Sequence, residues 1–162
     1  MPSVLFVCTA NLYRSPLAVA FLKEELKHAQ VGNEWLIDSA GTWTKSGTSI
    51  HSQTIEDAVH FGLDVRAHKS KQVTAALLSR QDLILVMETG HKEALLIEFP
   101  DQSKKVYLLS EVVDGHTYDI PDPFSSEGQH DRDIANELHR IIKRGYKGIF
   151  ALALENSNGS TI

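Results

Sequence analysis

Apolar residues fall along the chain in short continuous runs that alternate with stretches of helical spacing. The continuous runs are typical of buried strands because they are short and rich in branched side chains; they lie at residues 3–7, 35–40, 83–87 and 105–109. Elsewhere apolar residues recur every three or four positions, which predicts helices from residue 15 and near residues 53–61, 74–80, 89–98 and from about 131 onwards. This alternation predicts an α/β fold with three layers, in which a short parallel sheet of about four strands has helices on both faces.

Single residues mark some of the helix ends. Ser15 suits the N-cap of the first helix, with Pro16 at its first helical position. Gly62 follows the second helix, where a C-terminal glycine is expected, and Thr89 is expected to cap the fourth. Residues 114–127 form the one long segment that the pattern leaves irregular, and such segments often carry function.

Composition narrows the class of protein. The chain has 162 residues and 42% hydrophobic content, which allows a single domain over residues 1–162 with a proper core. A formal net charge of −5 argues against a nucleic-acid partner, because no broad basic surface could neutralise a phosphate backbone. No apolar run reaches the roughly 18 residues of a membrane span, and no export signal begins the chain. We therefore expect a cytoplasmic protein with no membrane partner.

The cysteine and histidine content of the chain limits which disulfides and metal sites it can form. The single cysteine allows no internal disulfide, which fits a reducing compartment. The eight histidines lack the paired spacings of metal sites, and no second thiolate is present to complete one. We expect no metal and no cofactor.

The cysteine lies in a loop between the first strand and the first helix. Cys8 and Arg14 are six positions apart there. Backbone N–H groups of a loop that curls into a helix N-terminus converge where the helix dipole favours negative charge. The same field stabilises a thiolate, which makes Cys8 a nucleophile, and Arg14 offers a planar fork for two phosphate oxygens. The predicted phosphate-binding residues are Thr9, Ala10, Asn11, Leu12, Tyr13 and Ser15, the last of which can also donate to the sulfur.

Other interpretations of this loop compete with the catalytic one. A lone cysteine is more often a small buried hydrophobe than a nucleophile. An arginine six residues later and a Ser-Pro helix start favour catalysis, because a core cysteine requires neither. A nucleotide site fits poorly, since neither the glycine-rich dinucleotide motif nor a Gly-Lys-Ser/Thr phosphate loop occurs in the chain.

Residues 7–16 resemble the active-site loop of the low-molecular-weight protein tyrosine phosphatases. Nearly the whole chain shares the resemblance, since further segments match in order and at similar spacing at 38–42, 67–69, 85–87 and 119–124. The resemblance implies hydrolysis of phosphotyrosine monoesters through a phosphocysteine intermediate. It also implies that Asp122 is the general acid for the phenol leaving group and then the base toward water. Without the loop at Cys8, an Asp-Pro pair would be ordinary turn punctuation.

The resemblance assigns a pocket and a support network as well. An apolar slot for the phenyl ring would be formed by Leu12, Trp43 and Phe124. A hydrogen-bond network that braces the loop would be formed by Asn11, Ser39 and His68. Asparagine suits such a loop because it tolerates left-handed backbone angles. Taken alone, the aromatic residues would be assigned to the core.

The chain departs from the family at several positions. Ala10 stands where glycine is usual, and a left-handed alanine would cost on the order of 1–2 kcal/mol. Tyr13 replaces the second loop cysteine of many members, so a protective disulfide with Cys8 cannot form and the pocket rim would change shape. Phe124 and the serine after it replace the tandem tyrosines of some members.

Three other functions stay open. The first is an arsenate reductase on the same fold, which would need an external thiol because one cysteine cannot run the family's internal relay. The second is a protein-arginine phosphatase, whose loop resembles this one at Thr9 but favours threonine where Leu12 stands. The third is a silent phosphate-binding module. For the tyrosine phosphatase we expect a phosphotyrosine-containing protein as partner, with a bacterial tyrosine kinase as one candidate, and a monomer or weak dimer.

Overall fold

A parallel sheet forms the centre of the computed structural model, which describes residues 1–31, 34–124 and 131–159. Its strands are β1 (Ser3–Cys8), β2 (Leu36–Gly41), β3 (Leu83–Val86) and β4 (Val106–Leu108), in the order β2-β1-β3-β4. Every neighbouring pair is parallel. The predicted short parallel sheet is confirmed, and each strand boundary lies within one residue of its expected position.

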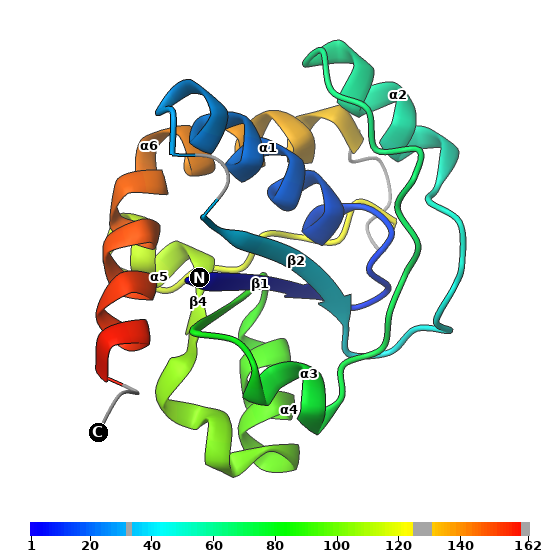
Figure 1. Ribbon diagram of the computed structural model, residues 1–162. Coiled ribbons are helices and arrows are strands. Elements are labelled where there is room, and N and C mark those ends of the chain that lie inside the picture. The colour runs from blue at the N-terminus through cyan, green and yellow to red at the C-terminus, as the bar shows by residue number, and fades with distance from the viewer. Residues whose placement is uncertain (32–33, 125–130, 160–162) are drawn as a thin grey trace.

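Helices cover both faces of this sheet (Figure 1). On one face lie α1 (Arg14–His28), α5 (Leu109–Asp114) and the long α6 (Asp131–Gly159), with α2 (Ser52–His60) beside them. On the other lie α3 (Ala75–Ser79) and α4 (Thr89–Glu98), followed by the 3₁₀ helix η1 (Pro100–Lys105). The predicted three-layer α/β class is therefore confirmed. Among the described helices, none combines the length and apolar character that a bilayer crossing requires.

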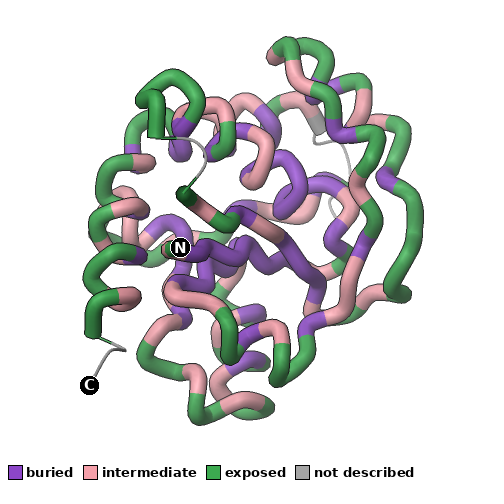
Figure 2. The backbone as a smooth tube through the Cα atoms, in the orientation of Figure 1, coloured by how far each residue is buried: buried purple, intermediate pink, exposed green. Residues whose placement is uncertain are grey.

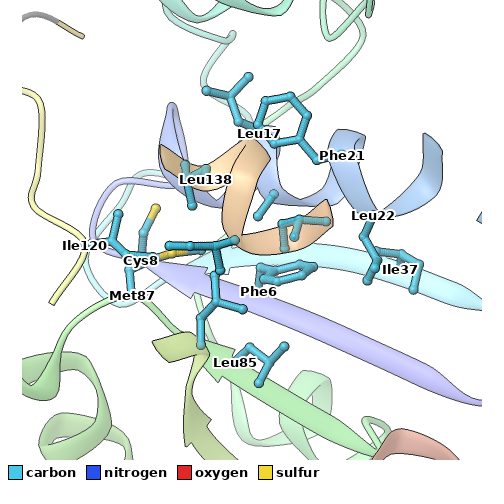
Figure 3. Packing of buried hydrophobic residues seen from close by; sticks show 14 of the residues in the cluster. Phe6, Cys8, Leu17, Phe21, Leu22, Ile37, Leu85, Met87, Ile120 and Leu138 are labelled. Carbon is cyan, nitrogen blue, oxygen red and sulfur yellow. The ribbon is translucent and has the colours of Figure 1, made fainter. Parts of the chain in front are cut away.

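The core follows the alternation of side chains along β1. Every residue of this strand is buried, and the buried positions of the molecule gather along the sheet (Figure 2). Val4, Phe6 and Cys8 pack toward α1 and α6, whereas Leu5 and Val7 pack toward α3 and α4. Figure 3 shows the first of these layers, in which Cys8 lies at the end of the strand. The strand therefore delivers the thiol to the carboxyl edge of the sheet, where ligands of such folds bind.

The first helix begins earlier than expected. Its N-cap is Tyr13 and its first residue is Arg14, so Ser15 and Pro16 lie inside the first turn. The expectation that Ser15 caps the helix is wrong, because its hydroxyl lies 3.0 Å from the Cys8 sulfur and 2.8 Å from the Asn11 amide instead. Proline is tolerated in the first turn because the backbone N–H it lacks has no partner there in any helix.

The fourth helix is capped one residue earlier than predicted. Glu88 rather than Thr89 is the N-cap, and its carboxylate and the His91 side chain form a reciprocal capping box with each other's backbone N–H groups. Gly62 has a left-handed φ of 74° just after α2, which confirms the expected C-terminal glycine. Within residues 114–127, Asp114 ends α5, residues 115–124 contain neither helix nor strand, and 125–127 lie outside the described residues. Residues 42–51 and 61–74 are also long and irregular, so that segment is not the only one.

Candidate active site

The loop between β1 and α1 lies tightly against the end of β2. Two backbone N–H groups that follow β2 donate to the carbonyls of Cys8 and Thr9, at 2.9 and 3.0 Å. Gly41 ends β2 where a Cβ atom would come within 2.5 Å of the Thr9 carbonyl oxygen. Only glycine permits this approach, so the end of β2 sets the path of the loop.

The Cys8 thiol has a defined hydrogen-bond environment. It is free and buried, with its sulfur 3.0 Å from the Ser15 hydroxyl oxygen. The amide nitrogen of Asn11 lies 2.8 Å from the same oxygen and can only donate to it. The Ser15 hydroxyl therefore accepts from Asn11 and is free to direct its own hydrogen at the sulfur. The Ser15 hydroxyl is thus placed to donate a hydrogen bond to the Cys8 sulfur.

Asn11 holds the middle of the loop. It has a left-handed φ of 60°, and its amide nitrogen also donates to the Ser39 hydroxyl at 2.9 Å. Its side-chain oxygen accepts from the backbone N–H of Lys71 at 3.0 Å, and its carbonyl lies 2.7 Å from His68 Nε2. Burial lowers the pKa of His68. The structure thus brings together Asn11, Ser39 and His68, the three residues expected to brace the loop.

Ala10 and Tyr13, the two loop residues that depart from the resembled family, differ in their effect on the structure. Asn11 and Gln30 are the only residues other than glycine with positive φ in the described chain, so Ala10 escapes the left-handed strain considered above. Tyr13 is 3% exposed and turns inward, where its hydroxyl donates to a carboxylate oxygen of Asp57 at 2.5 Å. Tyr13 therefore ties the loop to α2, in addition to lining the cavity described below.

Arg14 connects the loop with two other segments. Its side chain is nearly fully buried, and one terminal nitrogen donates to the Glu88 carboxylate at 2.9 Å and to the Ile120 carbonyl at 2.8 Å. The other terminal nitrogen lies 3.5 Å from the Thr9 hydroxyl. Ile120 is itself bound to the end of β3, because its N–H donates to the Met87 carbonyl at 2.9 Å. The segment that precedes Asp122 is thereby aligned with Arg14.

A cavity of about 170 Å³ opens beside the thiol. Its lining is mostly apolar but includes a thiol, a guanidinium and a carboxylate: Cys8, Ala10, Leu12, Tyr13, Arg14, His51, Asp122 and Phe124. The three residues predicted to be catalytic, Cys8, Arg14 and Asp122, therefore share one cavity. The Asp122 carboxylate also accepts from the backbone N–H of Phe124 at 2.9 Å. Within the described residues, no three imidazole, thiol or carboxylate groups converge as metal ligands would.

The cavity wall differs from the expected slot. Leu12 and Phe124 lie in it, but Trp43 does not, because its side chain is 82% exposed and outside the lining. His51 lies there instead, with its ring 4.6 Å from that of Phe124. His51 caps α2 through its Nδ1 atom, which accepts from the backbone N–H of Gln53. In the sequence, the only sign of His51 was a histidine just before a predicted helix, and such a histidine does not indicate that the side chain lines a pocket.

His91 is a second residue that the sequence did not reveal. It is 6% exposed, and its Nε2 atom lies 2.8 Å from the Thr9 hydroxyl. Burial lowers the pKa of His91 to about 4, and the charge of Arg14 acts in the same direction. An uncharged imidazole therefore contacts Thr9 of the loop at neutral pH.

Comparison with known proteins connects this geometry with a family. Residues 3–155 match the low molecular weight phosphotyrosine protein phosphatase family. A probable low molecular weight protein-tyrosine-phosphatase, EpsP from Ralstonia nicotianae, is 34% identical over 88% of this chain and 90% of its own. A protein-arginine-phosphatase from Geobacillus stearothermophilus is 32% identical over 87% and 91%. The crystal structure of the tyrosine phosphatase Wzb from Escherichia coli in complex with sulphate superposes with a TM-score of 0.80 at 28% identity, over 92% of this chain and 99% of that one.

Proposed function

Because the chain belongs to the low molecular weight phosphotyrosine protein phosphatase family, we propose that it hydrolyses phosphotyrosine in proteins by way of a phosphocysteine formed on Cys8. The observation that carries this proposal is the shared cavity, in which a thiol, a guanidinium and a carboxyl group face one apolar wall. Thiolate, phosphate clamp and proton donor are the three parts that metal-free phosphoryl transfer to sulfur requires.

In the first step the phosphoryl group lies over the loop, where backbone N–H groups and Arg14 bind its oxygens. The Cys8 thiolate attacks phosphorus, so that a sulfur–phosphorus bond forms while the bond from phosphorus to the phenolic oxygen breaks. Asp122 gives its proton to the departing oxygen, because a phenolate with a conjugate-acid pKa near 10 leaves slowly. Arg14 follows the charge that spreads over the equatorial oxygens in the transition state.

In the second step a water molecule attacks the phosphocysteine. Asp122, now a carboxylate, takes a proton from this water, and the sulfur–phosphorus bond breaks to release inorganic phosphate and the thiolate. The Ser15 hydroxyl, 3.0 Å from the sulfur, stabilises the thiolate both before attack and after release.

The cavity wall favours an aryl substrate over phosphoarginine. Leu12, Phe124 and His51 suit a flat ring, whereas a guanidinium would require several hydrogen-bond acceptors. Among the described lining residues, Asp122 is the one carboxylate available for that purpose. Similarity to a protein-arginine-phosphatase makes this choice a matter for experiment. We expect a phosphotyrosine-containing protein in the cytoplasm as the partner, and a bacterial tyrosine kinase is one candidate.

The proposal is tested by phosphate release from matched phosphotyrosine and phosphoarginine peptides in metal-free buffer. We expect release from phosphotyrosine that Cys8→Ser abolishes. Release from phosphoarginine alone would change the assigned substrate to phosphoarginine but leave the phosphocysteine mechanism in place. Release that is indifferent to Cys8 would refute the mechanism, and a chain inactive on both peptides would then be assayed for arsenate reduction with an added external thiol.

A further inference from the structure

A polar cluster at the loop contains two side chains, those of Thr9 and His91, that take no part in the chemistry derived above. It consists of Thr9 in the loop, His91 on α4 and the two residues that contact them, Glu88 and Arg14. Some groups in this cluster can only donate a hydrogen bond, and they fix the donor and the acceptor in the remaining contacts.

The backbone N–H of Glu88 is such a group, because it can only donate. It lies 3.2 Å from His91 Nδ1, which must therefore carry a lone pair. With Nδ1 accepting, the ring hydrogen of His91 is on Nε2. His91 Nε2 lies 2.8 Å from the Thr9 hydroxyl oxygen, so the imidazole donates and the hydroxyl accepts. The carboxylate of Glu88, 3.4 Å from the same nitrogen, is consistent with this tautomer.

The Thr9 hydroxyl oxygen also faces a second donor. The Arg14 terminal nitrogen, 3.5 Å away, can only donate as well. Two donors therefore face the Thr9 oxygen, which leaves its own hydrogen available for another acceptor. Within the described part of the chain, this hydroxyl makes no further side-chain hydrogen bond that could receive it.

We infer that the Thr9 hydroxyl is an additional hydrogen-bond donor to the phosphoryl group bound beside Arg14, and that His91 is a positioning residue which fixes the direction of that donation. The inference rests on the proposed function, because it requires the anion to bind at the loop. A donor already aimed at the anion needs no reorganisation during the reaction, so it stabilises the charge of the transition state as well as that of the bound substrate.

The test of Thr9 compares Thr9→Val, Thr9→Ser and a matched control, Thr48→Val, whose hydroxyl is exposed and bonds to the Lys45 carbonyl. Thr9→Val should lower kcat/KM for a phosphotyrosine peptide, and weaken competitive inhibition by inorganic phosphate, by roughly ten- to a hundred-fold, the loss of a hydrogen bond to a charged group. Thr9→Ser keeps the hydroxyl and should recover most of this loss, whereas the control should stay within about threefold of the native chain. Equal activity and equal phosphate inhibition in Thr9→Val would overturn the inference.

The test of His91 uses His91→Gln, whose amide can donate in place of Nε2, and His91→Leu, which cannot. We expect His91→Leu to weaken phosphate inhibition and His91→Gln to restore most of it. In the Thr9→Val background, His91→Leu should have little further effect, because the hydroxyl that it positions is gone. Losses that multiply fully would show that His91 acts by another route.

Failure of this inference and failure of the proposed function give different results. Binding of inorganic phosphate to the native chain, measured by calorimetry, needs no turnover. Native protein that lacks Cys8-dependent phosphatase activity contradicts the proposed function. Native protein that is active and binds phosphate as tightly as Thr9→Val contradicts only the role of Thr9. Should His91→Leu fail to fold, the Thr9→Val and Thr9→Ser pair still decides whether the Thr9 hydroxyl donates to the phosphoryl group.

Discussion

The two segments that meet at the cavity are held in place by different means. The loop after Cys8 is held by hydrogen bonds from β2, α4 and the chain at residues 68 and 71. The segment that carries Asp122 is held through Asp119, which accepts from the Thr89 N–H at 2.7 Å, through the backbone of Ile120, and through the contact of the Phe124 ring with Tyr13. The loop is thus held by a network of hydrogen bonds, whereas the segment of Asp122 is held by one carboxylate, by backbone hydrogen bonds and by an aromatic contact.

This difference explains why Arg14 is central. It belongs to the loop, yet it donates to the carbonyl of Ile120, two residues before Asp122. In the proposed mechanism this guanidinium binds the phosphate, and in the structure it also holds the segment of the proposed proton donor. Substitutions can separate these contributions, and those below run from the largest expected effect to the smallest.

Arg14→Lys should cause the largest loss, because it removes the planar fork and the link to Ile120 together. We expect kcat/KM for a phosphotyrosine peptide to fall by roughly 10³-fold or more, the scale of losing an arginine that stabilises phosphoryl transfer. Steady-state kinetics on the purified variant measures this. A loss smaller than tenfold would mean that a point charge is sufficient and that the fork geometry is unimportant.

Asp122→Asn should act on the leaving group alone and leave the loop intact. Without a proton donor, kcat/KM for a phosphotyrosine peptide should fall by roughly 10²- to 10⁴-fold. An aryl phosphate with an acidic phenol should lose far less, because its leaving group needs no protonation. An equal loss with both substrates would show that Asp122 has another role, such as binding.

Stability should fall as the pH is lowered, because His91 is buried without charge. The pKa of His91 in the folded chain is about 4, below the unfolded value near 6.5, so between these values the unfolded chain binds a proton that the folded chain does not. This contribution to the free energy of unfolding is complete above about pH 6.5 and is lost as the pH falls to about 4, a total loss of about 3 kcal/mol. Denaturant titrations at several pH values measure it. The His91→Gln variant should show a shallower slope, and an unchanged slope would contradict the assignment.

Two substitutions of Asn11 can separate the contribution of its left-handed backbone from that of its side-chain amide. Asn11→Gly keeps the left-handed φ of 60° without strain and loses the amide, whereas Asn11→Ala loses the amide and adds strain. We expect both variants to lose activity, and Asn11→Ala to be less stable than Asn11→Gly by about 1 kcal/mol. Thermal unfolding of the pair gives this difference. Equal stabilities would mean that the backbone relaxes out of the left-handed region.

The parts of the molecule that could be predicted depend on neighbours in the chain. The strands followed from continuous apolar runs, and the loop followed from Cys8, Arg14 and the helix start directly behind them, all within a few residues. The cap of α1 was misplaced because the Ser15 hydroxyl is engaged with Cys8 and Asn11, which only the folded loop brings together.

The features that were missed depend on contacts across long stretches of chain. His51 reaches the cavity because α2 packs beside the loop, and His91 reaches Thr9 across 82 residues because β3 lies next to β1. Trp43 is the opposite case, a residue that was expected in the cavity and lies outside it. It lies close to the loop, since its N–H donates to the Thr9 carbonyl, but its ring points to solvent. Side-chain direction in an irregular segment follows from packing, which local pattern does not encode.

The central claim is that Cys8 itself takes the phosphoryl group, and rapid mixing tests it most directly. In Asp122→Asn, an aryl phosphate with an acidic phenol should still phosphorylate the thiolate, while hydrolysis of the intermediate lacks its base. We predict a burst of phenol equal to one phosphoryl group per chain and, after acid quenching, a matching mass gain on the peptide that contains Cys8. Steady phenol release without a burst, or a phosphoryl group found on another residue, would contradict the account.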